Sequence, residues 1–199
     1  MIRIVLAEDQ RMLLGALGSL LDLEEGMEVV GQATNGEEAI ELVQTHKPDV
    51  CIMDIEMPMK SGLDAAEELQ HEACKLIILT TFARSGYFER AQKAGVSGYL
   101  LKDSPIEELA TSIRKIINGQ RIFAPELVDL AFTNQNPLTE REKQVMQLVA
   151  EGKTTKDISK ELFITPGTVR NYVSVILDKL EVTNRIEAIS KFKEKGWYN

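Results

Sequence analysis

The chain has 199 residues, which is enough for one large domain or two small ones. Its residues are 44% hydrophobic and 27% charged, a composition that excludes a disordered or collagen-like chain. The formal net charge is -8, which for the chain taken as a whole argues against a protein that binds nucleic acid.

The first half of the chain alternates between two kinds of pattern. Short apolar runs rich in β-branched residues predict five strands, at residues 2–7, 27–33, 49–53, 76–80 and 98–101. Between them, runs of helical period predict helices at residues 11–24, 37–46, 63–71, 85–94 and 105–118. Strands that alternate with helices in this way predict βαβ units and a parallel sheet.

The second half contains only helical patterns, at residues 139–150, 155–162, 165–179 and 184–195. A polar stretch before Pro137 predicts a linker, so we divide the chain into a domain at 1–119, a linker at 120–136 and a domain at 137–199. Residues 1–120 hold 11 Lys and Arg against 20 Asp and Glu, a net charge of -9, whereas residues 121–199 have a net charge of +1. The acidity therefore belongs to the first domain, and the second is free to meet DNA.

Neither a signal peptide nor a membrane span is indicated. The N-terminus lacks the charged region and cleavage site of a secretory signal, and no apolar run approaches the ~20 residues of a membrane span. We therefore expect a cytoplasmic protein that does not enter a membrane. Cys51 and Cys74 have no His or Cys partner at metal spacing, and we expect both to be buried small hydrophobic residues.

Polar side chains follow the predicted strands at one edge of the sheet. Glu8 and Asp9 follow the first strand, Asp54 follows the third, Thr80 ends the fourth and Lys102 follows the fifth. In an open parallel sheet, ligands bind outside the carboxyl ends of the strands, so these groups are expected to converge.

Three neighbouring carboxylates repel one another, and a divalent cation would remove the conflict. Mg²⁺ prefers oxygen ligands, which Glu8, Asp9 and Asp54 supply. With the metal and Lys102 neutralising its charge, Asp54 could act as a nucleophile and carry an aspartyl phosphate, to which Thr80 could donate its hydroxyl. Taken singly, each residue has an ordinary alternative role: a helix cap, a strand former or a solvated lysine.

Four motifs of the first domain resemble the receiver domain of two-component response regulators. They are Glu8-Asp9, residues 53–58 (MDIEMP) with Gly62, residues 79–81 (LTT) and residues 98–102 (GYLLK). The resemblance implies that Asp54 is the phosphoacceptor and that Thr80, Tyr99 and Lys102 are its switch and counter-ion residues. It also implies a Mg²⁺ site made by Glu8, Asp9, Asp54 and the backbone carbonyl of Glu56.

Two positions depart from the usual receiver pattern. Glu8 stands where Asp is more common, which lengthens one arm of the metal site without removing its charge. Asp103 stands where proline is often found, so a cis peptide bond is not carried over to this chain.

Residues 165–172 (TPGTVRNY), preceded by a short turn, have the pattern of a DNA-reading helix-turn-helix. The outward candidates on this helix are Thr168, Arg170, Asn171 and Ser174. Arg pairs with guanine and Asn with adenine in the major groove. Lys179 and Arg185 are predicted as phosphate contacts, which position the protein but do not specify sequence. The alternative is a solvated helix face, since a net charge of +1 gives little of the basic footprint of a DNA-binding domain.

Residues 137–142 (PLTERE) and 184–188 (NRIEA) resemble the LuxR-type helix-turn-helix, and the two domains together resemble the NarL/FixJ class of response regulators. The resemblance implies an α/β, flavodoxin-like (βα)5 doubly wound parallel sheet followed by an all-α four-helix domain. It implies a sensor histidine kinase, promoter DNA and RNA polymerase as partners, and a homodimer formed on phosphorylation. Likeness to one member of that class, a regulator of membrane-lipid desaturation, implies membrane-lipid genes as targets. Tyr172 stands where His is frequent, so no base preference is transferred.

The predicted helix at 11–24 has more apolar residues than one core-facing stripe requires. We predict a dimer surface formed by Leu13, Leu14, Leu17 and Leu21, with a broad core-facing side as the alternative. Pairing would let two helix-turn-helix units bind two half-sites.

Two other functions remain open on the sequence alone. The first is an aspartyl-phosphate phosphatase, because Asp54 and Glu56 resemble a nucleophile with an acid two residues on; such enzymes usually have Asp at the second position. The second is a DNA-binding regulator that works without phosphate. The receiver resemblance favours a phosphoacceptor over an enzyme, with weak self-phosphorylation from small donors and self-dephosphorylation as side reactions.

Overall fold

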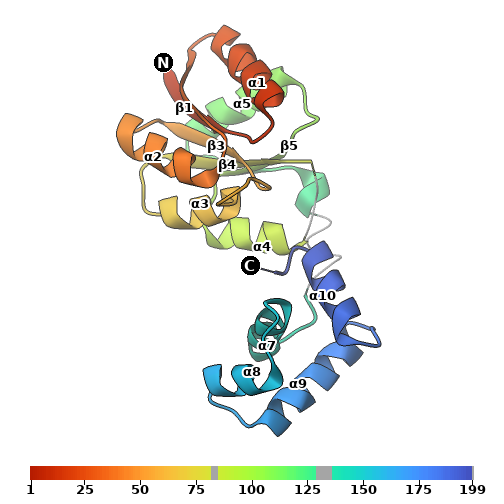
Figure 1. Ribbon diagram of the computed structural model, residues 1–199. Helices are drawn as coiled ribbons and strands as arrows, with labels where there is room; N and C mark the ends of the chain where they lie inside the picture. The colour runs from red at the N-terminus through yellow and green to blue at the C-terminus, as the bar shows by residue number, and fades with distance from the viewer. Residues whose placement is uncertain (82–84, 129–135, 199) are drawn as a thin grey trace. The chain divides into compact units, whose positions relative to one another are not determined.

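The computed structural model describes residues 1–81, 85–128 and 136–198 (Figure 1). These residues fall into two compact units, one containing residues 1–81 and 87–128 and the other residues 85–86 and 136–198. The domain limits drawn from the sequence remain predictions, and each unit is described below by itself.

The first unit is built on one parallel sheet. Its strands, in the spatial order β2-β1-β3-β4-β5-β6, are β1 (Ile2–Ala7), β2 (Met27–Ala33), β3 (Val50–Asp54), β4 (Lys75–Thr80), β5 (Gly98–Leu101) and β6 (Ile122–Phe123). All five residues of the central strand β3 are buried, which explains why the four residues before Asp54 form a continuous apolar run. The flavodoxin-like sheet predicted from the sequence is confirmed.

Helices cover both faces of the sheet (Figure 1). They are α1 (Arg11–Leu23), α2 (Gly36–His46), α3 (Gly62–Leu69), α4 (Ser85–Lys93) and α5 (Ile106–Ile117). Successive residues of β1 point to opposite faces: Ile4 and Leu6 pack with α1 and α5, and Val5 and Ala7 pack in the core that α2, α3 and α4 cover. The two faces of the sheet thus have two separate cores.

Strand β6 lies inside the predicted linker and was missed from the sequence. Ile122 and Phe123 pair in parallel with Gly98 and Tyr99 of β5. A two-residue strand is too short to show a period of two, so no sequence pattern could have marked it.

The second unit consists of α7 (Glu140–Ala150), α8 (Thr155–Glu161), α9 (Pro166–Lys179) and α10 (Arg185–Glu194). Its core includes Val145, Ile158, Val169 and Ile176, so the helices of the helix-turn-helix share one apolar centre. Threonine or asparagine caps each helix; Thr139, for example, accepts the backbone N–H of Glu142. The predicted all-α four-helix domain is confirmed.

The predicted dimer surface on α1 is wrong for two of its four residues. Leu14 and Leu21 are 6% and 0% exposed and belong to the core beneath α1. Leu13 and Leu17 are less buried than these two, and Met12, Leu20 and Leu23 are exposed. The apolar excess was predicted correctly but the rotation of the helix was not, because leucines occupy both sides of it.

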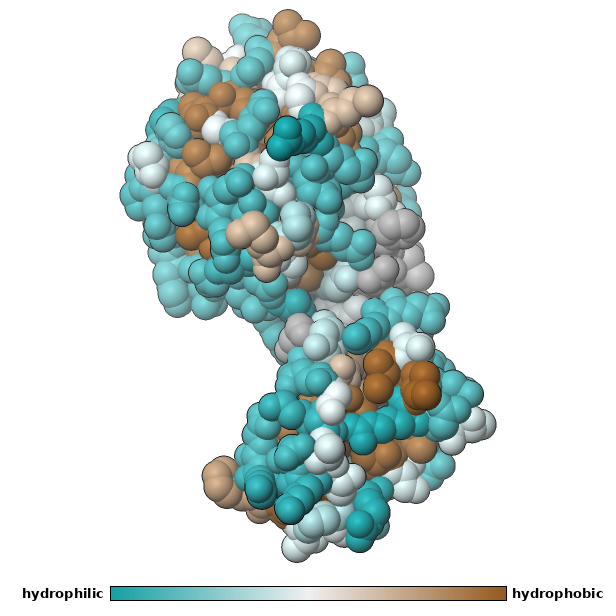
Figure 2. Space-filling view, viewed as in Figure 1, coloured by the Kyte–Doolittle hydropathy of each residue, from teal (hydrophilic) through white to brown (hydrophobic). Residues whose placement is uncertain are grey.

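Within the described residues no helix is long and apolar enough to span a bilayer. On the face drawn in Figure 2, hydrophilic residues predominate and hydrophobic groups are small and scattered. Cys51 is fully buried as expected, whereas Cys74 is partly exposed, and burial raises the pKa of the Cys74 thiol to about 12.

Candidate functional site

The carboxyl edge of the sheet brings three acidic side chains together. Glu8 and Asp9 follow β1, and Asp54 is the last residue of β3, which pairs directly with β1. Each of the three offers a carboxylate oxygen, and these oxygens lie within 4.8 Å of one another. Glu8 and Asp54 are buried, whereas Asp9 is exposed. The convergence expected of these residues is therefore present in the fold.

A lysine lies between two of these carboxylates. Lys102 follows β5, and its Nζ is 2.6 Å from Oε2 of Glu8 and 3.1 Å from Oδ2 of Asp54. The Lys102 side chain is only 7% exposed, so the three charges interact with little screening. Its backbone N–H donates to the carbonyl oxygen of Thr80 at 2.9 Å, which ties the lysine to the end of β4.

Burial is the main cause of the pKa shifts of the two buried carboxylates. It raises the pKa of Glu8 and of Asp54, and the nearby Lys102 ammonium only partly offsets this. Burial also opposes the charged form of Lys102, but the hydrogen bond to Glu8 and the charge of Asp54 outweigh it and raise the pKa of Lys102.

The donor set fits a magnesium ion. Three ionised carboxylates and one ammonium leave two uncompensated negative charges, which a divalent cation would cancel. All three acidic groups supply the oxygen ligands that Mg²⁺ prefers. Glu8, Asp9 and Asp54 are the side chains that would hold the ion; a contribution from the backbone carbonyl of Glu56 stays a prediction.

The loop after Asp54 is packed too closely for any side chain at its end. Gly62 begins α3, and its N–H donates to the carbonyl oxygen of Ile55 at 3.0 Å. A Cβ at position 62 would overlap the carbonyl oxygen of Asp54. From the sequence, Gly62 was only part of a motif; the structure gives it a physical reason.

Replacement of Gly62 by alanine is expected to displace α3 or the end of β3, because backbone atoms cannot move aside as a side chain can. We expect a loss of about 3 kcal/mol in the free energy of unfolding, the upper end for overpacking. Urea unfolding followed by circular dichroism would measure it. Gly15→Ala is the control, because a Cβ there meets no atom within 4 Å. Equal stability of the two variants would contradict this account of the loop.

The two predicted switch residues lie on neighbouring strands. Thr80 ends β4 and is 4% exposed, and its register partner is Leu101, the residue before Lys102. Tyr99 on β5 is fully buried, and its ring meets Phe88 of α4 edge to face at a centroid distance of 5.7 Å. Thr80 is therefore beside the carboxylate cluster in the sheet, and Tyr99 connects the sheet to α4. Their switching roles stay predictions.

Helix α9 presents the predicted base-reading residues. Arg170, Asn171 and Ser174 lie on α9 outside its buried positions, and Thr168 is half-buried near the helix start. Val169 and Ile176 face the core instead. The helix begins at Pro166 after the N-cap Thr165, so its first turn is free of long side chains that would obstruct a groove. The face is chemically able to contact base edges.

Both predicted phosphate contacts have partners inside their own unit. Nζ of Lys179 is 2.9 Å and 2.7 Å from the two carboxylate oxygens of Glu142 on α7. Arg185 donates to the carbonyl oxygen of Lys153 at 2.5 Å. These contacts fix α9 and α10 against the rest of the unit, a role that sequence patterns did not reveal because the partners are 37 and 32 residues away.

The Glu142 to Lys179 contact makes the second unit sensitive to acid. Burial opposes the charged form of Glu142, but hydrogen bonds from Lys179 and Thr139 outweigh it and lower the pKa of Glu142. A carboxylate with a lowered folded-state pKa stabilises the fold above its ordinary pKa, and this stabilisation is lost as pH falls through the folded-state value. We expect Glu142→Gln to cost about 1.5–3 kcal/mol at neutral pH, the range for a hydrogen bond to a charged group.

The difference between wild type and Glu142→Gln should shrink below pH 4.5, the ordinary pKa of the group. Trp197 is the one tryptophan of the chain and packs on the core of the second unit, so its fluorescence follows the unfolding of that unit. Glu140→Gln removes the same charge from an exposed side chain of the same helix turn and should have little effect. A pH-independent difference would contradict the assignment.

Both halves of the chain match known protein families. The family "Response regulator receiver domain" matches residues 4–114, and "Bacterial regulatory proteins, luxR family" matches residues 136–192. The chain is 66% identical over 198 residues to "Transcriptional regulatory protein DesR" of Bacillus subtilis (strain 168), with 100% of both chains covered. It is 62% identical to "Uncharacterized transcriptional regulatory protein YvfU" of the same organism, covering 99% of this chain and 100% of the relative.

Among solved structures, the response regulator ChrA of a heme-sensing two-component system matches with a TM-score of 0.60 and 29% identity, covering 98% of each chain. The curated relatives named above are transcriptional regulators, which favours regulation of transcription over the phosphatase alternative.

Proposed function

The chain belongs to the response regulators that join a receiver domain to a LuxR-type DNA-binding domain and is a regulator of transcription, and we propose that phosphorylation of Asp54 by a sensor histidine kinase controls it. The observation that carries the proposal is the position of Lys102, buried between Glu8 and Asp54 beside Thr80. A solvated or capping role would not require these groups to meet in one buried cluster.

The transfer step forms one bond and breaks another. An oxygen of Asp54 attacks the phosphorus of the kinase phosphohistidine, and the bonding pair of the P–N bond returns to the imidazole nitrogen. Glu8, Asp9 and Asp54 would hold a Mg²⁺ ion, which would neutralise negative charge on the phosphoryl group. Lys102 is already within 3.1 Å of Asp54 and needs no large movement to pair with a phosphoryl oxygen. Thr80 then donates its hydroxyl to a second oxygen.

The response acts on DNA through α9. Arg170 and Asn171 contact base edges in the major groove, and Thr168 and Ser174 add shorter polar contacts. Lys179 and Arg185 support this face by holding α9 and α10 in place, since each has a partner within the unit. The relatives' names support regulation of transcription, and the likeness of the sequence to a regulator of membrane-lipid desaturation supports promoters of membrane-lipid genes as the targets, with RNA polymerase as a further partner.

Dimerisation uses a groove between α1 and α5 that a second copy of the chain occupies. Leu13, Leu17 and Leu20 of α1 line it together with Ile106 of α5. The groove, about 160 Å³ in volume, is also lined by Leu101 and by Lys102, the residue that contacts Asp54. Pairing two DNA-binding units of net charge near +1 compensates for the weak electrostatic attraction of each one.

Phosphorylation in solution tests the proposal. The full chain is treated with a small phosphoryl donor and Mg²⁺. Mass spectrometry then measures phosphate on Asp54. Light scattering measures the molecular mass in solution, and fluorescence anisotropy measures the affinity for promoter DNA. We expect phosphate uptake, a doubled mass and an affinity gain of about tenfold or more, because linking two sites raises the effective concentration. Chelation of the metal should prevent uptake. Phosphate uptake without any change in mass or DNA affinity would contradict the scheme.

A further inference from the structure

Helix α4 is attached to the segment that follows the phosphoacceptor. Tyr87 and Arg90 lie three residues apart, on one side of α4. Both contact residues between the end of β3 and the middle of α3. Neither residue was singled out by any sequence motif.

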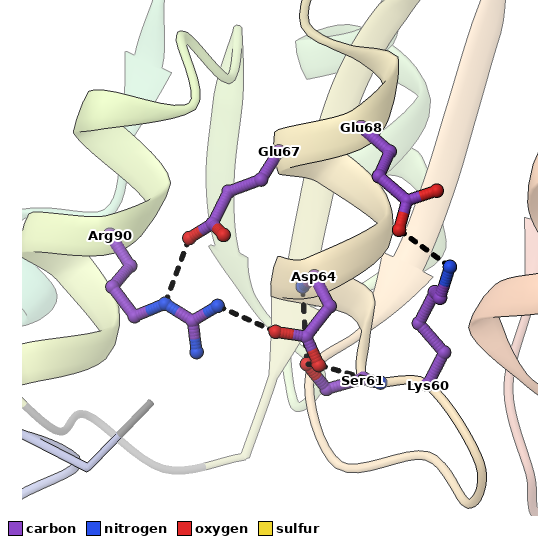
Figure 3. Close-up of polar contacts among 6 residues, drawn as sticks. All are labelled: Lys60, Ser61, Asp64, Glu67, Glu68 and Arg90. Atoms are coloured by element: carbon purple, nitrogen blue, oxygen red, sulfur yellow. Dashed lines mark hydrogen bonds and ion pairs between the residues drawn. The ribbon is translucent and has the colours of Figure 1, made fainter. Parts of the chain in front are cut away.

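Arg90 makes the stronger attachment (Figure 3). Its Nε donates to Oε1 of Glu67 at 2.9 Å, and its Nη2 donates to Oδ1 of Asp64 at 2.7 Å. The Arg90 side chain is only 14% exposed, although its partners are about half exposed. A guanidinium that spans two carboxylates on successive turns fixes both the distance and the rotation of α4 relative to α3, which a single flexible charge would not do.

Asp64 carries this attachment back to the phosphoacceptor. Its other oxygen, Oδ2, accepts from the Ser61 hydroxyl at 2.6 Å and from the Ser61 N–H at 3.2 Å, in the capping box that starts α3. Gly62, which follows Ser61, lies so close to the Asp54 carbonyl oxygen that no Cβ fits between them. The contacts from Asp54 to Arg90 are therefore short and involve backbone atoms and the helix cap.

Two further contacts extend the connection at both ends. The Tyr87 hydroxyl donates to Oε1 of Glu56 at 3.3 Å, only two residues after Asp54. Phe88, also on α4, packs edge to face on Tyr99 and on Phe123 of β6. The position of α4 thus determines the surroundings of Tyr99, on the strand that leads to Lys102.

We propose that Arg90 is a positioning residue that couples α4 to the phosphoacceptor loop, so that phosphorylation of Asp54 is transmitted to α4 and Tyr99 through Asp64 and Glu67. This inference rests on the proposed phosphorylation of Asp54. Without the guanidinium, Asp54 keeps its neighbours Glu8 and Lys102 and still accepts phosphate, but phosphorylation affects α4 and Tyr99 less.

A second ion pair on α3 gives a matched control (Figure 3). Nζ of Lys60 is 2.5 Å from Oε1 of Glu68, and Figure 3 shows this pair on a different side of α3 from Arg90. Arg90→Gln and Lys60→Gln each remove one positive charge that pairs with α3, but only the first removes a contact with α4. A third variant, Arg90→Lys, keeps the positive charge but removes the planar guanidinium that donates to Asp64 and Glu67 at the same time.

The experiment measures two quantities for each full-length variant: phosphate on Asp54 after treatment with a small donor and Mg²⁺, and the DNA-affinity gain that phosphorylation causes. For Arg90→Gln we expect phosphate uptake equal to that of wild type and a gain reduced by a factor of about 3 to 30, the range for residues that carry coupling. Lys60→Gln should equal wild type in both phosphate uptake and affinity gain. The affinity gain of Arg90→Lys should lie between those of wild type and Arg90→Gln.

The outcomes separate the two proposals. No phosphate uptake by wild type overturns the proposed function and the coupling with it. Uptake by wild type with an undiminished affinity gain in Arg90→Gln overturns the coupling alone. The coupling is also overturned if Lys60→Gln loses the gain equally, or if Arg90→Gln no longer takes up phosphate, because Arg90 would then act on general stability or within the site. Thermal unfolding by circular dichroism confirms that each variant is folded.

Discussion

Asp54→Asn is expected to abolish phosphate uptake and, with it, the entire phosphorylation-dependent gain in mass and DNA affinity. An amide oxygen is a poor nucleophile and carries no charge, so neither attack on phosphorus nor the balance of charges around Lys102 is preserved. The replacement has nearly the same shape, and Glu8 remains 2.6 Å from Lys102, so the buried lysine keeps a partner and the fold should persist. Mass spectrometry after donor treatment measures the loss.

Asp103→Asn is the matched control for this variant. Asp103 follows Lys102 directly and lies outside the carboxylate cluster, so the same charge is removed from the same edge of the sheet without touching that cluster. Uptake by Asp103→Asn should equal that of wild type. If Asp54→Asn still acquired one phosphoryl group and the same DNA affinity, another residue would be the acceptor, and the function proposed from this site would be wrong.

The convergence of Glu8, Asp54 and Lys102 could be predicted from the sequence because of how parallel sheets are built. Glu8, Asp54 and Lys102 each stand at the end of an apolar run, and parallel strands end at one edge. Residues far apart in the chain therefore meet without any knowledge of side-chain contacts. The third strand ends one residue later than predicted: Asp54 lies within β3, so its backbone is held by the sheet.

Other features depended on information that no local pattern contains. The rotation of α1 decides that Leu14 is buried while Leu13 is less so, and both positions fit an apolar helix. Lys179 is predicted as a phosphate contact, but no local pattern showed that it also has a carboxylate partner, Glu142, on a helix two elements earlier. Arg90 likewise finds Asp64 and Glu67 only after the sheet has placed α3 beside α4.

Loss of sequence discrimination is expected from Arg170→Ala and from Asn171→Ala. Both side chains are exposed on α9; Arg170 has two parallel donors for a bidentate contact with guanine, and Asn171 has a donor and an acceptor for one with adenine. Each truncation should reduce the preference for the promoter over unrelated DNA by about 1–3 kcal/mol, a factor of roughly 5 to 150. Anisotropy titrations of the phosphorylated protein with both DNAs, at one fixed salt concentration, measure the ratio.

Lys193→Ala provides the comparison for charge alone, since Lys193 is an exposed cation of α10 outside the reading face. Its loss removes as much charge as Arg170→Ala and should leave the ratio of the two affinities unchanged. A base contact affects only the cognate sequence, whereas a phosphate contact weakens binding to every sequence and lowers the salt dependence by about one unit per contact. If Arg170→Ala and Asn171→Ala weakened both DNAs equally, α9 would hold the backbone rather than read bases, and specificity would have to come from the shape of the DNA.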